Sequence, residues 1–225
     1  MQAKDVESMQ ELARQLRTPH GSNGTQVAAS MHASNIGMTR ACFTSLQVED
    51  GRHVLEIGHG AGAHVAELFE MQPGMTYQGL ELSELMHREA VANNQSQVAK
   101  GTAQFSLYEG EIFPFADACF HRTMSVNTLY FLPEPSGFLD EVYRTLRPSG
   151  AFAVAFAARD FMRTLSFAQY GFQLYTTEEV ERLLHAAGFR TVKTEIHSEL
   201  IASKEGPGET VHRDFVVVRA NKPAD

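Results

Sequence analysis

Three glycines at alternate positions follow a short apolar run in the sequence Val-Leu-Glu-Ile-Gly-His-Gly-Ala-Gly, residues 54–62. The apolar run is typical of a buried strand, and the amphipathic run Ala63–Met71 that follows is typical of a helix. Gly58, Gly60 and Gly62 allow a tight turn in which backbone approaches a ligand closely, at the amino terminus of that helix. This order of strand, glycine turn and helix predicts a ligand-binding unit in an open α/β sheet.

Apolar and amphipathic runs alternate along the chain from residue 53 onward. The predicted strands are 53–57, 76–82, 103–108, 122–126 and 151–157, and the predicted helices between them are 63–71, 84–99 and 137–146. This alternation predicts βαβ units, and therefore a mostly parallel, doubly wound, Rossmann-like α/β sheet covered by helices on both faces.

The carboxyl-terminal part of the chain has a different pattern. The strand-like runs 191–196 and 211–220 flank a polar loop, residues 203–209, with no room for a helix between them. We therefore expect a hairpin whose final strand is antiparallel within a seven-stranded sheet.

Helix caps punctuate the predicted elements. Thr176 and Glu179 form a capping box, and Gly188 ends the helix that follows. Ser83 and Ser136 are each placed to cap a helix.

The first fifty residues form a preface to the sheet. Residues 4–16 are predicted to be helical, the turn-rich stretch 18–24 breaks that helix, and a second helix is expected at 35–46. We interpret residues 1–50 as a helical lid and residues 51–225 as the main domain.

Composition excludes several classes of protein. The net charge of −8 disfavours a nucleic-acid-binding surface. No apolar run approaches the roughly 18 residues that span a membrane, and the polar amino terminus is unlike a signal peptide. Cys42 and Cys119 are predicted to be buried thiols in a reducing compartment, and no metal site follows from the histidine and cysteine spacing. A soluble, cytoplasmic protein is expected.

The glycine turn by itself is compatible with two cofactor classes. It also matches the dinucleotide fingerprint, with Glu81 placed 21 residues after Gly60 to bind ribose hydroxyls, so an NAD(P)-dependent oxidoreductase is one hypothesis. Three acids, Glu56, Glu81 and Glu109, end successive strands, and a carboxylate before the turn repels a pyrophosphate but attracts a cation. The acids favour a ligand with an ammonium or sulfonium at one end and an adenine amine at the other.

Five segments in this order resemble the class I S-adenosylmethionine-dependent methyltransferases, of the small-molecule, type 11-like kind. The segments are 54–62, 79–86, 109–115, 119–130 and 144–150. The resemblance covers residues 51 to about 220 and implies the fold described above, an S-adenosylmethionine cofactor and a small-molecule acceptor.

The resemblance implies a role for each matching residue. Gly58, Gly60 and Gly62 hold the methionine moiety together with His59, and Glu56 lies beside its amino group. Glu81 binds the ribose hydroxyls and Leu82 flanks the adenine. Glu109 and Gly110 face the adenine edge, and Asn127 lies near the reactive methyl. Further candidates for the cofactor site or the acceptor site are Met31, His32, Asn35, Met38, His64, Tyr130, Phe156, Phe172 and Tyr175.

Each acceptor-site candidate has a structural alternative. Tyr130 is the one candidate catalytic residue, but it is equally compatible with packing. Phe156 is expected in the sheet core, Asn35 fits a helix cap, and His64 fits a polar helix residue. The aromatic run 161–175 is compatible with a lid, with a cover over the sheet or with a contact in a homodimer. A cofactor-binding but non-catalytic partner subunit is the remaining alternative function.

Overall fold

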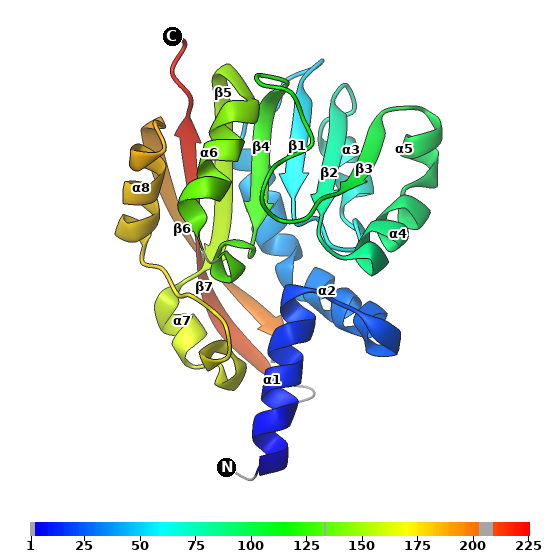
Figure 1. The fold of residues 1–225 in the computed structure, drawn as a ribbon, viewed down its shortest axis with the longest axis vertical. Helices are drawn as coiled ribbons and strands as arrows, with labels where there is room; N and C mark the ends of the chain where they lie inside the picture. Colours follow the sequence, from blue (N-terminus) through cyan, green and yellow to red (C-terminus); the bar gives the residue numbers. More distant parts are fainter. Residues whose placement is uncertain (1–2, 133, 203–208) are drawn as a thin grey trace.

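The computed structural model describes residues 3–132, 134–202 and 209–225, without the side chains of residues 3–5. Its centre is a seven-stranded sheet in the order β3-β2-β1-β4-β5-β7-β6 (Figure 1). The strands are β1 (His53–Ile57), β2 (Thr76–Glu81), β3 (Ala103–Leu107), β4 (Phe120–Val126), β5 (Leu146–Ala157), β6 (Arg190–Ala202) and β7 (Thr210–Asn221).

The direction of the strands matches the predicted mixed sheet. Strands β1 to β5 pair in parallel, whereas β7 is antiparallel to both β5 and β6. The hairpin is longer than expected, because β6 continues to Ala202 instead of ending at Ile196. The predicted loop of this hairpin, residues 203–209, lies outside the described residues except for Glu209.

Helices surround the sheet. They are α1 (Ala3–Arg17), α2 (Gly21–Ser45), α3 (Val65–Met71), α4 (Glu84–Asn93), α5 (Gln95–Ala99), α6 (Pro135–Thr145), α7 (Arg159–Arg163) and α8 (Thr177–Ala186), with 3₁₀ turns η1 (Leu129–Phe131) and η2 (Ser166–Gln169). In Figure 1, α1 and part of α2 lie beyond the carboxyl-terminal ends of the parallel strands.

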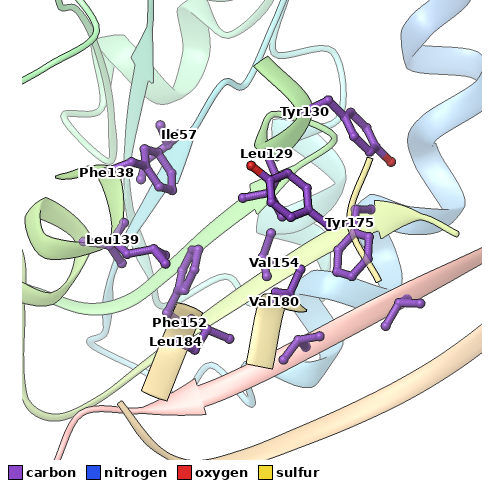
Figure 2. Close-up of a cluster of buried hydrophobic side chains, with 14 of the residues drawn as sticks. Ile57, Leu129, Tyr130, Phe138, Leu139, Phe152, Val154, Tyr175, Val180 and Leu184 are labelled. Atoms are coloured by element: carbon purple, nitrogen blue, oxygen red, sulfur yellow. The ribbon is translucent and has the colours of Figure 1, made fainter. Parts of the chain in front are cut away.

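Two apolar clusters fill the space between the sheet and the helices. One joins α6 and α8 to β5 through side chains such as Leu139, Phe152 and Leu184 (Figure 2). The other joins α2 and α3 to the opposite face, where Met38 and Leu68 are almost completely buried. Since each fully buried side chain of this size contributes about 1.5–3 kcal/mol, both faces stabilise the sheet that carries the site.

The amino-terminal helices differ from the prediction. Helix α2 begins at Gly21, fourteen residues before the expected start at Asn35, and the chain leaves helical geometry only between α1 and α2. A side chain at position 24 would meet Leu85 and Pro19, so Gly24 permits close packing of the chain rather than a turn. Asn35 is therefore inside a helix, and the cap interpretation is wrong.

Three of the predicted helix starts and one helix interior also differ or agree in detail. Ser83 accepts a hydrogen bond from the Met86 amide, as a cap does, and the Thr176 capping box is present. Ser136, in contrast, lies inside α6, which Glu134 precedes without a side-chain cap. The predicted helix 84–99 is divided into α4 and α5 at Asn94, whose side chain donates to the Gly62 carbonyl.

The two cysteines have different environments. Cys42 is completely buried in the cluster under α2, as predicted. Cys119 is only half-buried, because it lies in the exposed turn before β4 and donates to the Ala116 carbonyl at 2.8 Å.

Candidate functional site

The glycine turn after β1 has the backbone conformation that its sequence demands. Gly58, Gly60 and Gly62 all have positive φ angles, of 79°, 57° and 61°. The Gly58 amide donates to the Leu80 carbonyl at 2.8 Å, which anchors the turn to β2. A Cβ at Gly58 would lie 2.2 Å from the Thr128 methyl, whereas one at Gly60 meets nothing within 4 Å. The turn is therefore packed from behind and presents bare backbone in front.

A cavity of about 360 Å³ lies in front of this turn. We call it the glycine-loop chamber. Every residue that the sequence predicts to bind the cofactor lines it, namely Glu56, Gly58, His59, Gly60, Gly62, Glu81, Leu82, Glu109, Gly110 and Asn127. The chamber thus joins the carboxyl ends of β1, β2, β3 and β4, and α1 and α2 close its outer side.

Glu56 and His64 form a buried ion pair in this chamber. The His64 Nε2 lies 2.8 Å from Glu56 Oε2, and the Tyr77 hydroxyl donates to the same oxygen at 2.7 Å. Burial by itself raises the pKa of Glu56, but the charge and hydrogen bond of His64 outweigh burial and hold it below its ordinary value. Burial by itself lowers the pKa of His64. The charge and hydrogen bond of the Glu56 carboxylate together have the larger, opposite effect, so the pKa lies above its ordinary value. Each partner therefore favours the charged form of the other.

Glu81 holds the glycine turn to the end of β2. One carboxylate oxygen accepts from the Gly60 amide at 2.9 Å, and the other accepts from the amides of Leu82 and Ser83. A carboxylate has about four acceptor positions, so this arrangement leaves one free on the oxygen that faces the turn.

His59 has a different orientation from its neighbours in the turn. Its ring packs edge-on against Phe105 and beside Gly79, and Nδ1 is 2.7 Å from the Gly60 carbonyl. Burial is the largest influence on its pKa, which lies below the ordinary value. The ring therefore packs against Phe105 and Gly79 and supports the loop, and the residue also lines the chamber.

A second cavity of about 400 Å³ adjoins the first. We call it the apolar chamber, because most of its wall is aliphatic or aromatic. Phe172 lies at the centre of an aromatic wall, with ring centroids 4.7 Å from Phe131, 5.6 Å from Phe167 and 5.8 Å from Tyr130. The residues that line both chambers are Leu16, Met31, Asn35, Asn127 and Phe131, and they form the junction between the chambers.

The acceptor candidates are distributed unevenly over these cavities. Met31 and Asn35 line both chambers, and Tyr130 and Phe172 line the apolar chamber. His32 and His64 line only the glycine-loop chamber. Tyr175, Phe156 and Met38 line neither chamber, and each is buried in an apolar cluster. Tyr175 lies just before α8, and its side chain is packed in the core.

The Tyr130 hydroxyl is already engaged. It receives the Ala157 amide proton and lies 3.1 Å from Asn127 Oδ1 and 3.2 Å from the Ala157 carbonyl. Burial raises the pKa of this phenol above its ordinary value. These bonds make Tyr130 a positioning group for Asn127 and a poor proton acceptor.

Several lining residues were not among the site residues predicted from the sequence. Leu16 comes from α1, Ile201 from β6, and Arg213 from β7. Only Arg213 of these three could have been found from the sequence. It is a charged residue in the alternating series with Phe215 and Val217, whose side chains face the core.

Two other features are absent from the described part of the chain. No helix in that part of the chain is long and apolar enough to cross a membrane. Over the same residues, no group of three or more histidine, cysteine, aspartate or glutamate side chains could hold a metal ion.

Comparison with known proteins identifies the fold and a matching family model. A family model described as a methyltransferase domain matches residues 55–154. The O-methyltransferase resE of Aspergillus sclerotiorum is 26% identical over 171 residues, which cover 73% of this chain and 64% of that protein. The methyltransferase GfsG of Streptomyces halstedii is 29% identical over 118 residues, 52% of this chain and 42% of that protein. The chain thus spans about two fifths to slightly under two thirds of these relatives.

A solved structure has the same architecture. A chain in the complex between the Haloferax volcanii Trm112 methyltransferase activator and a methyltransferase superposes with a TM-score of 0.73 at 18% identity, covering 87% of this chain and 92% of that one. The sheet order, the glycine turn and the matched family model together lead to one conclusion. The chain has the Rossmann-like fold of solved methyltransferase structures, and its residues 55–154 match a methyltransferase-domain family model.

Proposed function

We propose that this protein binds S-adenosylmethionine in the glycine-loop chamber and transfers its methyl group to a small molecule in the apolar chamber. The observation that carries the proposal is the adjacency of the two chambers. All of the predicted cofactor residues line the first, and the second opens from it at a junction that includes Asn127 and Asn35. The relative named as an O-methyltransferase supports an oxygen acceptor.

The chamber fits the proposed cofactor in shape and charge. Gly60 leaves open space where a side chain would stand, so backbone can approach the methionine moiety. The Glu56 carboxylate and His64 imidazolium lie side by side, as an ammonium and a carboxylate do in the cofactor. Glu81 retains an acceptor position for a ribose hydroxyl, and the exposed Glu109 is placed at the chamber rim for the adenine amine.

The bound cofactor supplies an activated methyl group on a sulfonium. The protein then has two tasks, to hold the acceptor in line with that methyl and to keep water away. We infer that the aromatic wall around Phe172 holds the acceptor, and that α1 and α2 cover the junction as a lid. Leu16 of α1 and Met31 of α2 are the apolar side chains that would exclude water there.

Thermal unfolding with different ligands tests the proposal. S-adenosylmethionine or S-adenosylhomocysteine at about 100 times its dissociation constant should stabilise the protein by roughly 2.7 kcal/mol. For a chain of this size the midpoint should rise by roughly 5–10 °C. NADH and NADPH should have no effect, because the Glu56 carboxylate beside the glycine turn disfavours a pyrophosphate.

The alternatives predict other results. Stabilisation by NADH or NADPH alone would replace the proposal with a nucleotide-dependent oxidoreductase. Stabilisation by S-adenosylmethionine without turnover of a broad acceptor panel, together with co-purification of another chain, would favour a non-catalytic partner subunit.

A further inference from the structure

The junction between the two chambers contains two polar side chains, Asn35 and Asn127. Leu16, Met31 and Phe131 supply its apolar surface. Because the junction is shared by both chambers, it is where an acceptor in one must approach a cofactor in the other. The hydrogen-bonding character of the two amides therefore constrains which acceptor atoms can be held there.

The Asn35 amide is oriented by Arg213. The guanidinium Nη1 donates to Asn35 Oδ1 at 3.2 Å, and the Ser34 hydroxyl is 3.4 Å from the same oxygen. A guanidinium only donates, so the amide oxygen must face it and cannot be exchanged with the nitrogen. Among the described residues the Asn35 Nδ2 has no hydrogen-bond partner, so both of its N–H groups are available at the junction.

Asn127 is oriented in a similar way. Its Oδ1 accepts from the Tyr130 hydroxyl at 3.1 Å, and its Nδ2 lies 3.3 Å from the Met38 sulfur, a weak acceptor. The residue has a φ angle of 57°, a conformation that asparagine tolerates better than most side chains. Its oxygen is thus engaged, while one N–H group remains for a ligand.

Arg213 adds further N–H donors behind these amides. Its side chain is buried and pairs with Glu199 and the Ser34 carbonyl, and the residue also lines the apolar chamber. Its Nε is buried without a hydrogen-bond partner in the described structure. The polar end of the apolar chamber is therefore rich in N–H donors.

Proton acceptors are absent from the junction. No titratable side chain of the described residues lines both chambers. His32 lines only the glycine-loop chamber, while Asp160, His212 and Asp214 line only the apolar chamber and are exposed. An acceptor that loses a proton on methylation, such as an alcohol, finds donors at the junction but no base.

We propose that the acceptor is an apolar molecule bearing an oxygen acid that is already ionised when it binds, a carboxylate or an equally acidic enol. Its oxyanion lies against the Nδ2 groups of Asn35 and Asn127, and its apolar body lies along the aromatic wall. The inference rests on the proposed function and specifies the substrate class of the same site.

The reaction balances without a catalytic base. A lone pair of the acceptor oxygen forms the new carbon–oxygen bond as the methyl–sulfur bond breaks. The electron pair of that bond stays on sulfur, which becomes a neutral thioether, and no proton is released. The negative charge on oxygen and the positive charge on sulfur cancel, giving a methyl ester or enol ether.

Binding of a matched ligand series to the protein saturated with S-adenosylhomocysteine tests the inference. The ligands are octanoate, 1-octanol and octylammonium, measured by calorimetry at pH 7.5. Carboxylic acids ionise near pH 4, so octanoate carries its charge. We expect octanoate to bind at least about tenfold more tightly than either other ligand, as hydrogen bonds to a charged group imply.

The variant Asn35→Asp tests the inference more directly than the ligand series does. It keeps an oxygen for Arg213 but replaces the free N–H donors with an acceptor. Octanoate affinity should fall by at least about tenfold and octylammonium affinity should rise. Asn23→Asp makes the same charge change at an exposed position of α2 and should alter neither affinity.

The outcomes separate the two proposals. Failure of S-adenosylhomocysteine to bind would overturn the proposed function. If it binds, the inference alone is overturned by undetectable octanoate binding, by equal or tighter binding of 1-octanol or octylammonium, or by an unchanged octanoate affinity in Asn35→Asp.

Discussion

At the scale of single residues, the buried pair of Glu56 and His64 links stability to pH. Both side chains are almost inaccessible, and their nearest atoms are 2.8 Å apart. The other charged or titratable groups that influence His64 are Glu67 of its own helix α3 and two histidines, His59 and His32. These neighbours also titrate, so the effect of the pair must be measured as a difference between variants.

We expect the advantage of the natural protein over His64→Gln to be greatest between about pH 4.5 and 6.5, the ordinary pKa values of the two groups. A raised histidine pKa stabilises the folded state below pH 6.5, and this contribution is lost as pH rises through the folded-state value. A lowered carboxyl pKa stabilises above pH 4.5, and that contribution is lost as pH falls through its folded-state value. The difference should reach about 1–3 kcal/mol, as for a hydrogen bond to a charged group.

Urea unfolding from pH 4 to 9 measures this difference. His212→Gln changes an exposed histidine and should reproduce the natural pH profile. A difference between the natural protein and His64→Gln that does not vary with pH would mean that the pair is not ionised in the folded state.

Gly60 and Gly51 separate backbone strain from ligand contact. Both have positive φ angles, 57° and 72°, and a Cβ at either position meets nothing within 4 Å. Alanine at each should cost roughly 1–2 kcal/mol of folding free energy, because the left-handed conformation crowds a Cβ. Gly60→Ala should also lower S-adenosylhomocysteine affinity more than about tenfold, whereas Gly51→Ala should not. Calorimetry and urea unfolding measure both effects, and equal affinities would argue that the ligand does not approach Gly60.

At the scale of elements, Ser83 connects the start of α4 to the corner between α1 and α2. Its hydroxyl donates to the Pro19 carbonyl at 2.7 Å and accepts from the Met86 amide at 3.3 Å. One buried side chain thus caps a helix and holds the segment that closes the glycine-loop chamber.

Ser83→Ala should cost about 1–2 kcal/mol, because it removes a helix cap together with a hydrogen bond between elements. Ser136→Ala is the matched control, since Ser136 is exposed and caps nothing; its cost should be within about 0.5 kcal/mol. Chemical denaturation gives both values. Similar costs for the two variants would contradict the capping role of Ser83.

Helix α2 belongs to two environments along its length. Met38, Cys42 and Phe43 near its end are packed in the core against the sheet, whereas Met31 and Asn35 line the chambers. If the amino-terminal segment acts as a lid, the part that moves is therefore α1 and the first half of α2.

At the scale of the whole molecule, ligand binding should stabilise the segments that close the chambers. We expect residues 36–45 to exchange amide hydrogens slowly even without ligand, because their side chains are part of the core. Residues 6–32 should exchange faster and slow down when S-adenosylhomocysteine is added. Hydrogen exchange followed by mass spectrometry measures this, with NADH as the control ligand. Uniform protection of residues 6–45 in the free protein would contradict a mobile lid.

The fold and the glycine-loop chamber were predictable because their signals are local. The glycines at 58, 60 and 62 have positive φ angles, and Glu56 and Glu81 stand at the ends of the two strands beside that turn. Parallel strands with short connections bring such residues to one edge of the sheet. The mostly parallel sheet, its antiparallel last strand and the predicted cofactor residues that line this chamber were therefore predictable from the sequence, whereas the strand order came from the structure.

Only the tertiary structure determined the apolar chamber and the character of the junction. Leu16, Asn127, Phe172 and Arg213 are far apart in the sequence, and the orientation of the Asn35 amide depends on an arginine from β7. Likewise, the glycines at 21 and 24 resemble a turn in sequence, yet both lie in α2, where Gly24 packs closely against Leu85 of α4. Periodicity and turn chemistry describe neighbouring residues, whereas cavities and side-chain orientation are set by contacts between distant segments.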